Sequence, residues 1–264
     1  ILGPTPITSN ITITDASCNG GNDGSVIVIP SGGTTPYSYN WGGVNTNALS
    51  AGIYAVTVTD INGCQSLPSP ITYQISEPSV ITPTVSSTPV SCTGGGDGSA
   101  VVSVSGGTYP YTYLWSTSGS SSPSINNLTA GTYYVSVTDD NGCPSTGSVV
   151  ITEPNNSVGI SITPTHVGCN GDSDGEAIAY GIGGTPPYSY LWSNGQTTQT
   201  SIGLSAGTYN CVVIDANNCV NTTSTTINEP SPIVANESPI DVSCFGLSDG
   251  SVTVNPSGGS GVYN

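Results

Sequence analysis

One motif returns at a nearly fixed interval along the whole chain. The pattern Cys-x-Gly-x-x-Asp-Gly begins at Cys18, Cys92, Cys169 and Cys244, so its copies start 74, 77 and 75 residues apart. A period of this length indicates tandem copies of one small unit. We therefore expect three complete repeats and a truncated fourth, at 1–79, 80–155, 156–231 and 232–264, and we expect the chain to be a window from a longer protein.

The absence of basic residues excludes several functions. The chain has no Lys or Arg and 16 acidic residues, for a net charge of −16. Without cations it cannot neutralise phosphates, so we expect no nucleic-acid partner. An anionic membrane surface repels it, and no apolar run approaches the length of a membrane span, so we expect no direct membrane insertion. Every carboxylate must therefore face water, accept hydrogen bonds or hold a metal ion.

The pattern inside each repeat predicts strands. Apolar residues alternate with period two, and Gly, Pro and Asn separate the alternating stretches. A core-facing Trp on the third strand fits immunoglobulin-like packing. We therefore predict an all-β fold of tandem immunoglobulin-like β-sandwich repeats of about 75 residues. The predicted core aromatics, for which a sugar-stacking face is the alternative, are Trp41, Trp115, Trp192, Tyr54, Tyr133 and Tyr209.

Units of about 75 residues bury little surface and are only marginally stable, so we expect disulfide bonds between the cysteines to stabilise them. Pairing inside each repeat, which we favour, gives Cys18–Cys64, Cys92–Cys143 and Cys169–Cys219. The rival pairing joins neighbouring repeats through Cys64–Cys92 and Cys143–Cys169. Cys244 is left for a partner beyond this chain. Disulfides indicate an oxidising, extracellular setting. Cys211 takes the place of a strand valine and is expected to be a buried free thiol.

The strand count leaves one conflict. About six strands fit into each repeat. Six antiparallel strands put both cysteines of a repeat at one end, as the internal bridge requires. They also put both chain ends at the opposite end, which is awkward for a straight rod. A seventh strand, or a cysteine inside its strand, would remove this conflict.

Recurring acidic residues offer a possible metal site. They lie in the Gly-rich turns and before the Asn-containing turns, at Asp23, Asp60, Asp97, Asp139, Asp174 and Asp215. If a disulfide draws the two turns together, a carboxylate pair with backbone carbonyls can hold calcium, which takes six to eight oxygens. The alternative, which we favour, is that Asp and Asn stabilise turns through local hydrogen bonds. No cofactor is required under either interpretation.

Taken together, the motifs resemble the SprB repeat family of Bacteroidota. They are Cys-x-Gly-x-x-Asp-Gly, Gly-Gly-x-x-Pro-Tyr-x-Tyr-x-Trp, Leu-x-Ala-Gly-x-Tyr-x-Val-x-Val-x-Asp, Asn-Gly-Cys and a closing Glu-Pro, in the same order in each complete repeat. Repeat 3 departs from them at Cys211, which replaces a Val, and at Asn218, which replaces the Gly of Asn-Gly-Cys. The resemblance implies very large, repetitive cell-surface proteins exported by the type IX secretion system, among them a gliding-motility adhesin. It implies no residue-level functional site.

Catalysis has little support, because one histidine cannot serve three units and phosphate chemistry lacks Lys and Arg. We expect no enzyme. A surface adhesin stalk or filament, for attachment or gliding, is one hypothesis; a multivalent polysaccharide-binding module is the other. Outward positions such as Thr57 and Ser136 are small and polar, which favours the stalk. The expected partners are further repeats of the same chain, and like chains in a filament or surface glycans.

Overall fold

The computed structural model describes Gly3, residues 5–259 and residues 262–263. The outer repeat bounds at Ile1 and Asn264 lie outside these residues. The described residues form strands and turns, and none of them forms a helix long and apolar enough to cross a membrane. The chain divides into two compact units, Ile1–Pro89 with Gly96–Thr152, and Val90–Gly95 with Glu153–Asn264.

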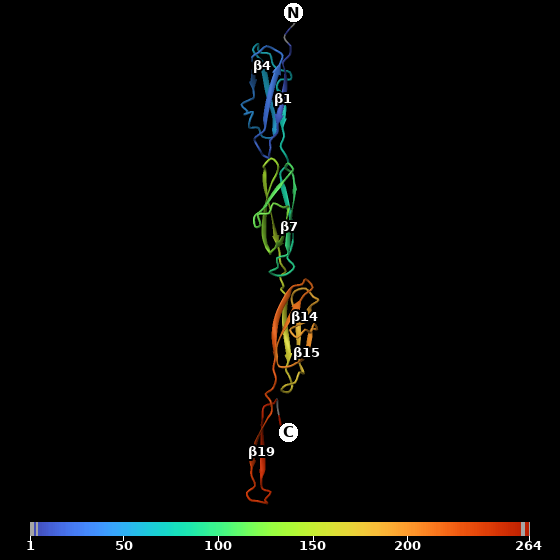
Figure 1. Ribbon diagram of the computed structural model, residues 1–264. Coiled ribbons are helices and arrows are strands. Elements are labelled where there is room, and N and C mark those ends of the chain that lie inside the picture. The colour runs from blue at the N-terminus through green and yellow to red at the C-terminus, as the bar shows by residue number, and fades with distance from the viewer. Residues whose placement is uncertain (1–2, 4, 260–261, 264) are drawn as a thin grey trace. The chain divides into compact units, whose positions relative to one another are not determined.

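The first unit holds eleven strands from two repeats (Figure 1). Repeat 1 contributes β1 (Thr8–Thr14), β2 (Ser25–Ser31), β3 (Tyr37–Asn40), β4 (Gly52–Asp60) and β5 (Ile71–Ile75). Repeat 2 contributes β6 (Thr82–Thr88), β7 (Gly98–Ser105), β8 (Thr112–Trp115), β9 (Ser124–Leu128), β10 (Gly131–Thr138) and β11 (Pro144–Ile151).

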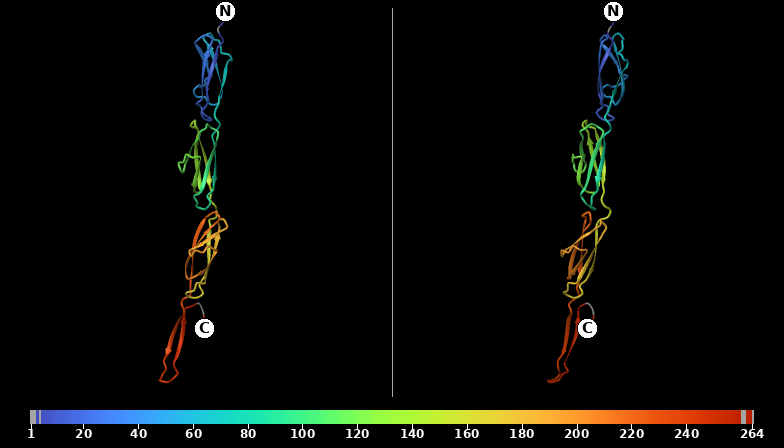
Figure 2. Two further views of the ribbon diagram at one scale, coloured as in Figure 1. Left: turned by 45° about the vertical axis from the view of Figure 1, so that its right-hand side comes forward. Right: turned by 90° about the vertical axis from the view of Figure 1, so that its right-hand side faces the viewer.

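The second unit holds the next six-stranded repeat and one hairpin. Its strands are β12 (Gly159–Thr165), β13 (Gly175–Ile182), β14 (Ser189–Trp192), β15 (Thr200–Leu204), β16 (Gly207–Ile214), β17 (Val220–Ile227), β18 (Val234–Ile240) and β19 (Ser251–Ser257). The two views of Figure 2 show the strands of each repeat running along its length. Strands β18 and β19 form an antiparallel hairpin that belongs to repeat 4.

Two three-stranded antiparallel sheets build each six-stranded repeat. In repeat 2 the sheets have the orders β6-β7-β9 and β11-β10-β8, and repeat 3 has the equivalent sheets β12-β13-β15 and β14-β16-β17. The first, second and fourth strands thus share one sheet and the third, fifth and sixth share the other, as strands A, B, E and C, F, G do in immunoglobulin domains. Repeat 1 replaces the fourth strand by a single bridge between Gly24 and Leu49. The predicted all-β fold of immunoglobulin-like sandwich repeats is confirmed.

A tyrosine near the start of the fifth strand fixes the corner that precedes it. The Tyr133 hydroxyl donates to the carbonyl of Thr129 at 3.0 Å, four residues upstream. Tyr54 and Tyr209 make the same bond to Ser50 and Ser205. This tyrosine corner is a hallmark of immunoglobulin-like sandwiches. It gives the recurring Ala-Gly-x-Tyr motif a structural role.

The core lies between the sheets, and small residues on the second strand make room for the tryptophan. In repeat 3, Trp192 is 1 % exposed and packs with Ala177 and Ala179. In repeat 1 the equivalent positions hold the larger Val26 and Val28, and Trp41 is only half-buried against the same cluster. A close-packed core has a fixed volume, so larger strand residues leave less room for the ring.

The path from β8 to β9 resolves the conflict over chain direction. β8 pairs with β10 from Thr112 opposite Thr138, at the end of the repeat that holds Asp139. After a loop, β9 continues in the other sheet until Leu128 lies opposite Gly98, at the start of β7. The chain therefore changes sheets without reversing. The expectation that both cysteines of a repeat share one end is wrong, because Cys92 precedes β7 whereas Cys143 follows β10, and β7 and β10 run in the same direction.

Candidate functional site: the junction between successive repeats

Both disulfides join one repeat to the next. Cys18 is bonded to Cys143 with a Cα–Cα distance of 5.7 Å, and Cys92 is bonded to Cys219 at 5.5 Å. The favoured internal pairs and the rival neighbour pairs are therefore both wrong. The physical reason is that the two cysteines of one repeat lie at its opposite ends. Among the described residues, Cys64, Cys169 and Cys244 are unbonded and exposed.

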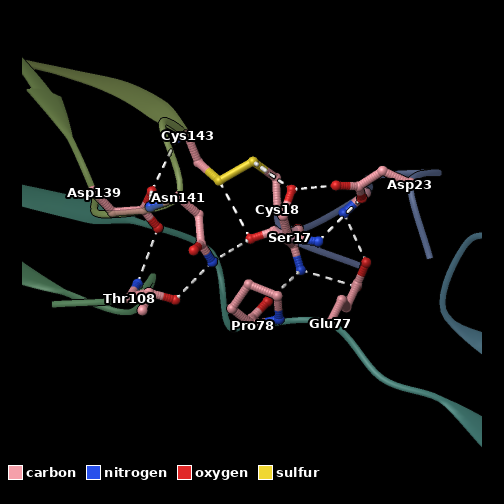
Figure 3. Close-up of a disulfide and its surroundings, with 11 residues drawn as sticks. Ser17, Cys18, Asp23, Glu77, Pro78, Thr108, Asp139, Asn141 and Cys143 are labelled. Atoms are coloured by element: carbon pink, nitrogen blue, oxygen red, sulfur yellow. Dashed lines mark hydrogen bonds between the residues drawn. A yellow bond between two sulfur atoms is a disulfide. The ribbon is translucent and has the colours of Figure 1, made fainter. Parts of the chain in front are cut away.

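Each bond lies in a small cluster that we call a junction. Junction A, in the first unit, comprises residues 17–23, 77–81, Thr108 and residues 139–145. Junction B, in the second unit, comprises residues 91–95, 153–158, Thr185 and residues 215–221. Each has two sides, the Cys-x-Gly turn of one repeat and the Asn-containing loop of the next. Figure 3 shows both sides of junction A around the disulfide.

An aspartate shapes the loop side of junction A (Figure 3). Asp139 ends the fifth strand and accepts hydrogen bonds from the backbone N–H groups of Thr108 at 2.9 Å, Asn141 at 3.1 Å and Cys143 at 2.9 Å. Asp139 is 5 % exposed. Burial acts to raise the pKa of this carboxyl, but the three N–H donors outweigh burial and hold the pKa below its ordinary value. The loop is therefore preshaped around a carboxylate that needs no cation.

The same arrangement returns in the other repeats. Asp215 accepts N–H groups from Thr185, Asn217 and Cys219, and the bond from Thr185 does most to lower its pKa. Asp60 accepts the N–H groups of Thr34, Asn62 and Cys64. Burial acts to raise the pKa of Asp60, and these donors lower it overall. The loop geometry is thus present whether or not its cysteine is bonded.

A glutamate closes the turn side of junction A. Glu77 accepts the Asn19 side-chain amide at 2.9 Å and the Gly20 backbone N–H at 2.7 Å. In junction B, Gly94 donates to Glu153 at 2.7 Å in the same way. The sequence patterns alone do not assign this role to the closing Glu-Pro motif. The recurrence of Glu at the end of every complete repeat was the signal available for it.

Side-chain hydrogen bonds reinforce the covalent link in junction A. The amide nitrogen of Asn141 donates to the Ser17 carbonyl of the preceding repeat at 2.9 Å, and to Thr108 at 3.2 Å within its own repeat (Figure 3). Within repeat 2, Ser145 donates to the Ile81 carbonyl at 3.0 Å, which fixes the loop against the start of its own repeat. The loop Asn therefore contacts both repeats, which gives the Asn-Gly-Cys motif a role at the interface.

The structure separates the acidic pairs expected to hold calcium. Asp23 precedes β2, whereas Asp60 accepts the N–H of Thr34, just beyond the far end of β2. The prediction of a calcium site built from these two carboxylates is therefore wrong. The same strand direction places Asp97 and Asp139 at opposite ends of repeat 2, and Asp174 and Asp215 at opposite ends of repeat 3. The described residues contain no group of three or more His, Cys, Asp or Glu placed to hold a metal ion. Whether the chain binds calcium elsewhere is not tested by the structure.

Turn hydrogen bonds occupy the Asp of the Cys-x-Gly turn. Asp23 accepts both the hydroxyl and the backbone N–H of Ser17, and these bonds lower its pKa. Asp174 accepts the N–H of Gly168 at 3.0 Å. These are the local side-chain-to-backbone bonds of the favoured alternative.

The remaining predicted positions lie in or near the core. Trp115 is 1 % exposed and donates its indole N–H to the Ser122 carbonyl, whereas Tyr133 is buried and Tyr54 and Tyr209 are half-buried. The thiol of Cys211 is buried, and burial raises its pKa. Outward faces are less uniformly polar than the two quoted positions indicated, because Leu114 and Tyr134 are exposed.

Comparison with known families gives one match. The model described as SprB repeat matches residues 10–46, 84–120, 161–197 and 236–264, together more than half of the chain. Each matched segment contains the Cys-x-Gly turn, most of the strand before it and the whole strand after it. A comparison with curated protein sequences gives no match.

Several solved structures show weak similarity. The C-terminal fragment of intimin, in complex with the intimin-binding domain of the translocated intimin receptor, is 16 % identical over 60 % of this chain and 67 % of that one, with a TM-score of 0.28. The eight N-terminal Ig domains of Down Syndrome Cell Adhesion Molecule are 14 % identical over 76 % of this chain, which spans 35 % of that structure, with a TM-score of 0.28. A tetra-tandem repeat from the extending region of a large adhesion protein is 13 % identical over 97 % of this chain and 81 % of that one, with a TM-score of 0.27. We draw no functional conclusion from them.

Proposed function

The chain belongs to the SprB repeat family, and we propose that it is a non-catalytic repeat segment of a large secreted cell-surface adhesin, in which tandem repeats form an extended stalk. The resemblance implies the bacterial cell surface, export by the type IX system and a role in attachment or gliding. The disulfides support an oxidising extracellular location. The proposed partners are further repeats of the same chain, and like chains in a filament or surface glycans.

The observation that carries the stalk proposal is the way the disulfides interleave. Cys92 lies inside the segment closed by Cys18 and Cys143, and its partner Cys219 lies beyond that segment. A pulling force can therefore pass from Cys18 through the first bond to Cys143, back along 51 residues to Cys92, and through the second bond to Cys219. Without the bonds, the 201 residues between Cys18 and Cys219 are all free to extend.

This shortcut limits how far the repeats can be pulled out. A fully extended chain spans at most about 3.5 Å per residue, so 201 residues reach about 700 Å and 51 residues about 180 Å. A repeat that unfolds under load therefore releases only a fraction of its length. Such a limit suits a segment that must keep its cargo attached at a distance from the cell.

Single-molecule stretching of the oxidised chain, with handles at its two ends, tests this proposal. We expect the extension released between Cys18 and Cys219 to be about fourfold smaller than in the same chain after reduction, in the ratio of the two path lengths. Equal extensions before and after reduction would rule out a bond-limited stalk. Antibody labelling of intact cells, lost after external protease treatment, tests the surface location separately.

Glycan binding is the second candidate, and exposed aromatics favour it. Tyr109 is 80 % exposed and stands edge-on to Tyr111 with ring centroids 5.9 Å apart, and Tyr134 is 56 % exposed. Aromatic faces of this kind can pack against sugars, and tandem repeats would multiply a weak contact. A glycan array probed with the whole chain and with Y109A distinguishes the candidates. Binding that Y109A abolishes would favour the module over the stalk.

A further inference from the structure

Cys169 lies on a turn that is already built for a junction. It holds the position of Cys18 and Cys92 in the repeat, and it is exposed and unbonded. Gly171 donates its N–H to Glu229 at 2.7 Å, and the Asn170 amide donates to the Pro230 carbonyl at 3.1 Å. These bonds match those of Gly20 and Asn19 to Glu77 and Pro78 in junction A.

A hollow adjoins this thiol. It has a volume of 260 Å³ and is lined by Gly168, Cys169, Asn170, residues 230–233 and Gly259. The equivalent residues of junction A, namely Cys18, Asn19, residues 78–81 and Gly107, surround the place where Asp139 and Cys143 lie. The hollow beside Cys169 therefore has the lining of a filled junction without the loop that fills it.

We propose that the Cys169 hollow is a covalent acceptor site for a loop of the kind Asp-x-Asn-x-Cys. The occupant is defined by junctions A and B, where loops 139–143 and 215–219 are bonded to the equivalent cysteines. Such a loop brings a carboxylate that already accepts two N–H groups of the loop and one from the Thr turn of the same repeat, so it needs no basic residue in the acceptor. Its Asn would donate to the Gly168 carbonyl, which holds the position of Ser17.

Bond formation proceeds by thiol–disulfide exchange with a small disulfide such as oxidised glutathione. The Cys169 thiolate attacks this disulfide, forms a mixed disulfide and releases one glutathione thiolate. The loop thiolate then attacks the Cys169 sulfur, and the second glutathione leaves as a thiolate with the electron pair of the broken bond. The two protein thiols have lost two electrons and two protons, and the glutathione disulfide has been reduced.

Cys244 provides a control within the same chain. It lies on the same kind of turn, with Ser243 donating its backbone N–H to Asp249 at 3.0 Å. It is also exposed and unbonded. In the described part of this chain, no glutamate accepts the N–H of Gly246 as Glu229 accepts that of Gly171, so the turn at Cys244 lacks this contact. A site that depends on the hollow must favour Cys169 over Cys244.

The direct experiment completes the fourth repeat. Residues 185–231 are copied after Gly259, because Gly259 holds the position of Gly184, and the extended chain is oxidised with glutathione. We expect the added copy of Cys219 to bond with Cys169, so that Cys169 resists alkylation. In a matched chain with Ser in place of the added copy of Cys219, Cys169 should be alkylated. A bond from the added copy of Cys219 to Cys244 would overturn the proposal.

If the extended chain does not fold, an exchange experiment on the C64S chain still tests the proposal. The substitution removes the thiol of loop 60–64, which would otherwise compete with the probe. The probe is a peptide of residues 138–144 in a glutathione buffer, and mass spectrometry measures its occupancy at each cysteine. We expect about tenfold higher occupancy at Cys169 than at Cys244, equivalent to about 1.4 kcal/mol. Equal occupancy would overturn the proposal. The result depends on the junction alone, so it stands apart from any test of the adhesin function.

Discussion

At the scale of single residues, backbone N–H groups stabilise the buried carboxylates of this chain, as basic side chains do in other proteins. Asp60, Asp139 and Asp215 are each 5 % exposed, and each accepts three N–H groups from its own and a neighbouring turn. In a chain without Lys or Arg, this is how a buried carboxylate is stabilised. The three pKa values are lowered as a result.

These lowered pKa values predict acid sensitivity. A carboxyl whose folded pKa lies below its unfolded value of about 3.9 stabilises the fold above that value, and the contribution is lost as the pH falls through the folded pKa. We expect D139N to lower the unfolding temperature at pH 7 and to make it fall less steeply between pH 5 and pH 2. Thermal unfolding across this range measures both. Parallel curves for D139N and the unmodified chain would contradict the assigned role.

Cys211 offers a second test at this scale. It is fully buried at the position that holds Val56 and Val135 in the other repeats. We expect C211V to change the free energy of unfolding by less than about 1.5 kcal/mol, because the volume is conserved. C211S should cost about 1–3 kcal/mol, because it buries a hydroxyl. Denaturant unfolding compares the two, and equal costs would argue against a purely apolar site.

At the scale of strands, the change of sheet between β8 and β9 decides the polarity of the repeat. The chain leaves β8 in one sheet and enters β9 in the other sheet without changing direction. As a result, the Cys-x-Gly turn and the Asn-containing loop lie at opposite ends of the repeat. Every repeat can then present one kind of cysteine to the repeat before it and the other kind to the repeat after it. The tryptophan that ends β8 anchors the loop where the change of sheet begins, through its bond to Ser122.

Replacing this tryptophan by Ala should therefore lower the free energy of unfolding by different amounts in different repeats. Trp192 is 1 % exposed, and W192A should lower it by about 3–5 kcal/mol. Trp41 is half-buried beside larger valines, so W41A should cost clearly less. Denaturant unfolding of both variants measures the difference. Equal costs would contradict the packing argument.

Local patterns were enough to predict the strands and the sandwich, whereas of the six predicted core aromatics Trp41, Tyr54 and Tyr209 are only half-buried. Period-two alternation marks a strand and its inward face, and in β10 the Tyr-x-Val-x-Val pattern places Tyr133, Val135 and Val137 on the buried face. The same alternation is present whether a chain reverses or changes sheet after a loop. Residues 116–123 give no local sign of the difference, so the cysteine pairing was predicted wrongly. The turn role of Asp followed from residue chemistry, whereas the contact of Asn141 with Ser17 needed the junction itself.

At the scale of the whole molecule, each bond closes a segment longer than one repeat. The separations are 125 and 127 residues, and closing a loop of this length stabilises a fold by about 5 kcal/mol in the chain-entropy model. Replacing both Cys18 and Cys143 by Ser should therefore lower the free energy of unfolding of the first unit by several kcal/mol. Denaturant unfolding of the oxidised double variant and the unmodified chain measures it. An unchanged midpoint would contradict a stabilising bond.

The pairing between successive repeats is tested most directly by peptide mapping of the oxidised chain. With free thiols blocked, cleavage before aspartates should leave fragment 15–22 bonded to fragment 140–171, and fragment 60–96 bonded to fragment 215–240. Each larger fragment holds a second cysteine, Cys64 in 60–96 and Cys169 in 140–171. Finding the blocking group on these two residues assigns the bonds to Cys18–Cys143 and Cys92–Cys219. Fragment 15–22 bonded to fragment 60–96 would instead mean Cys18–Cys64 or Cys18–Cys92, and would contradict this account.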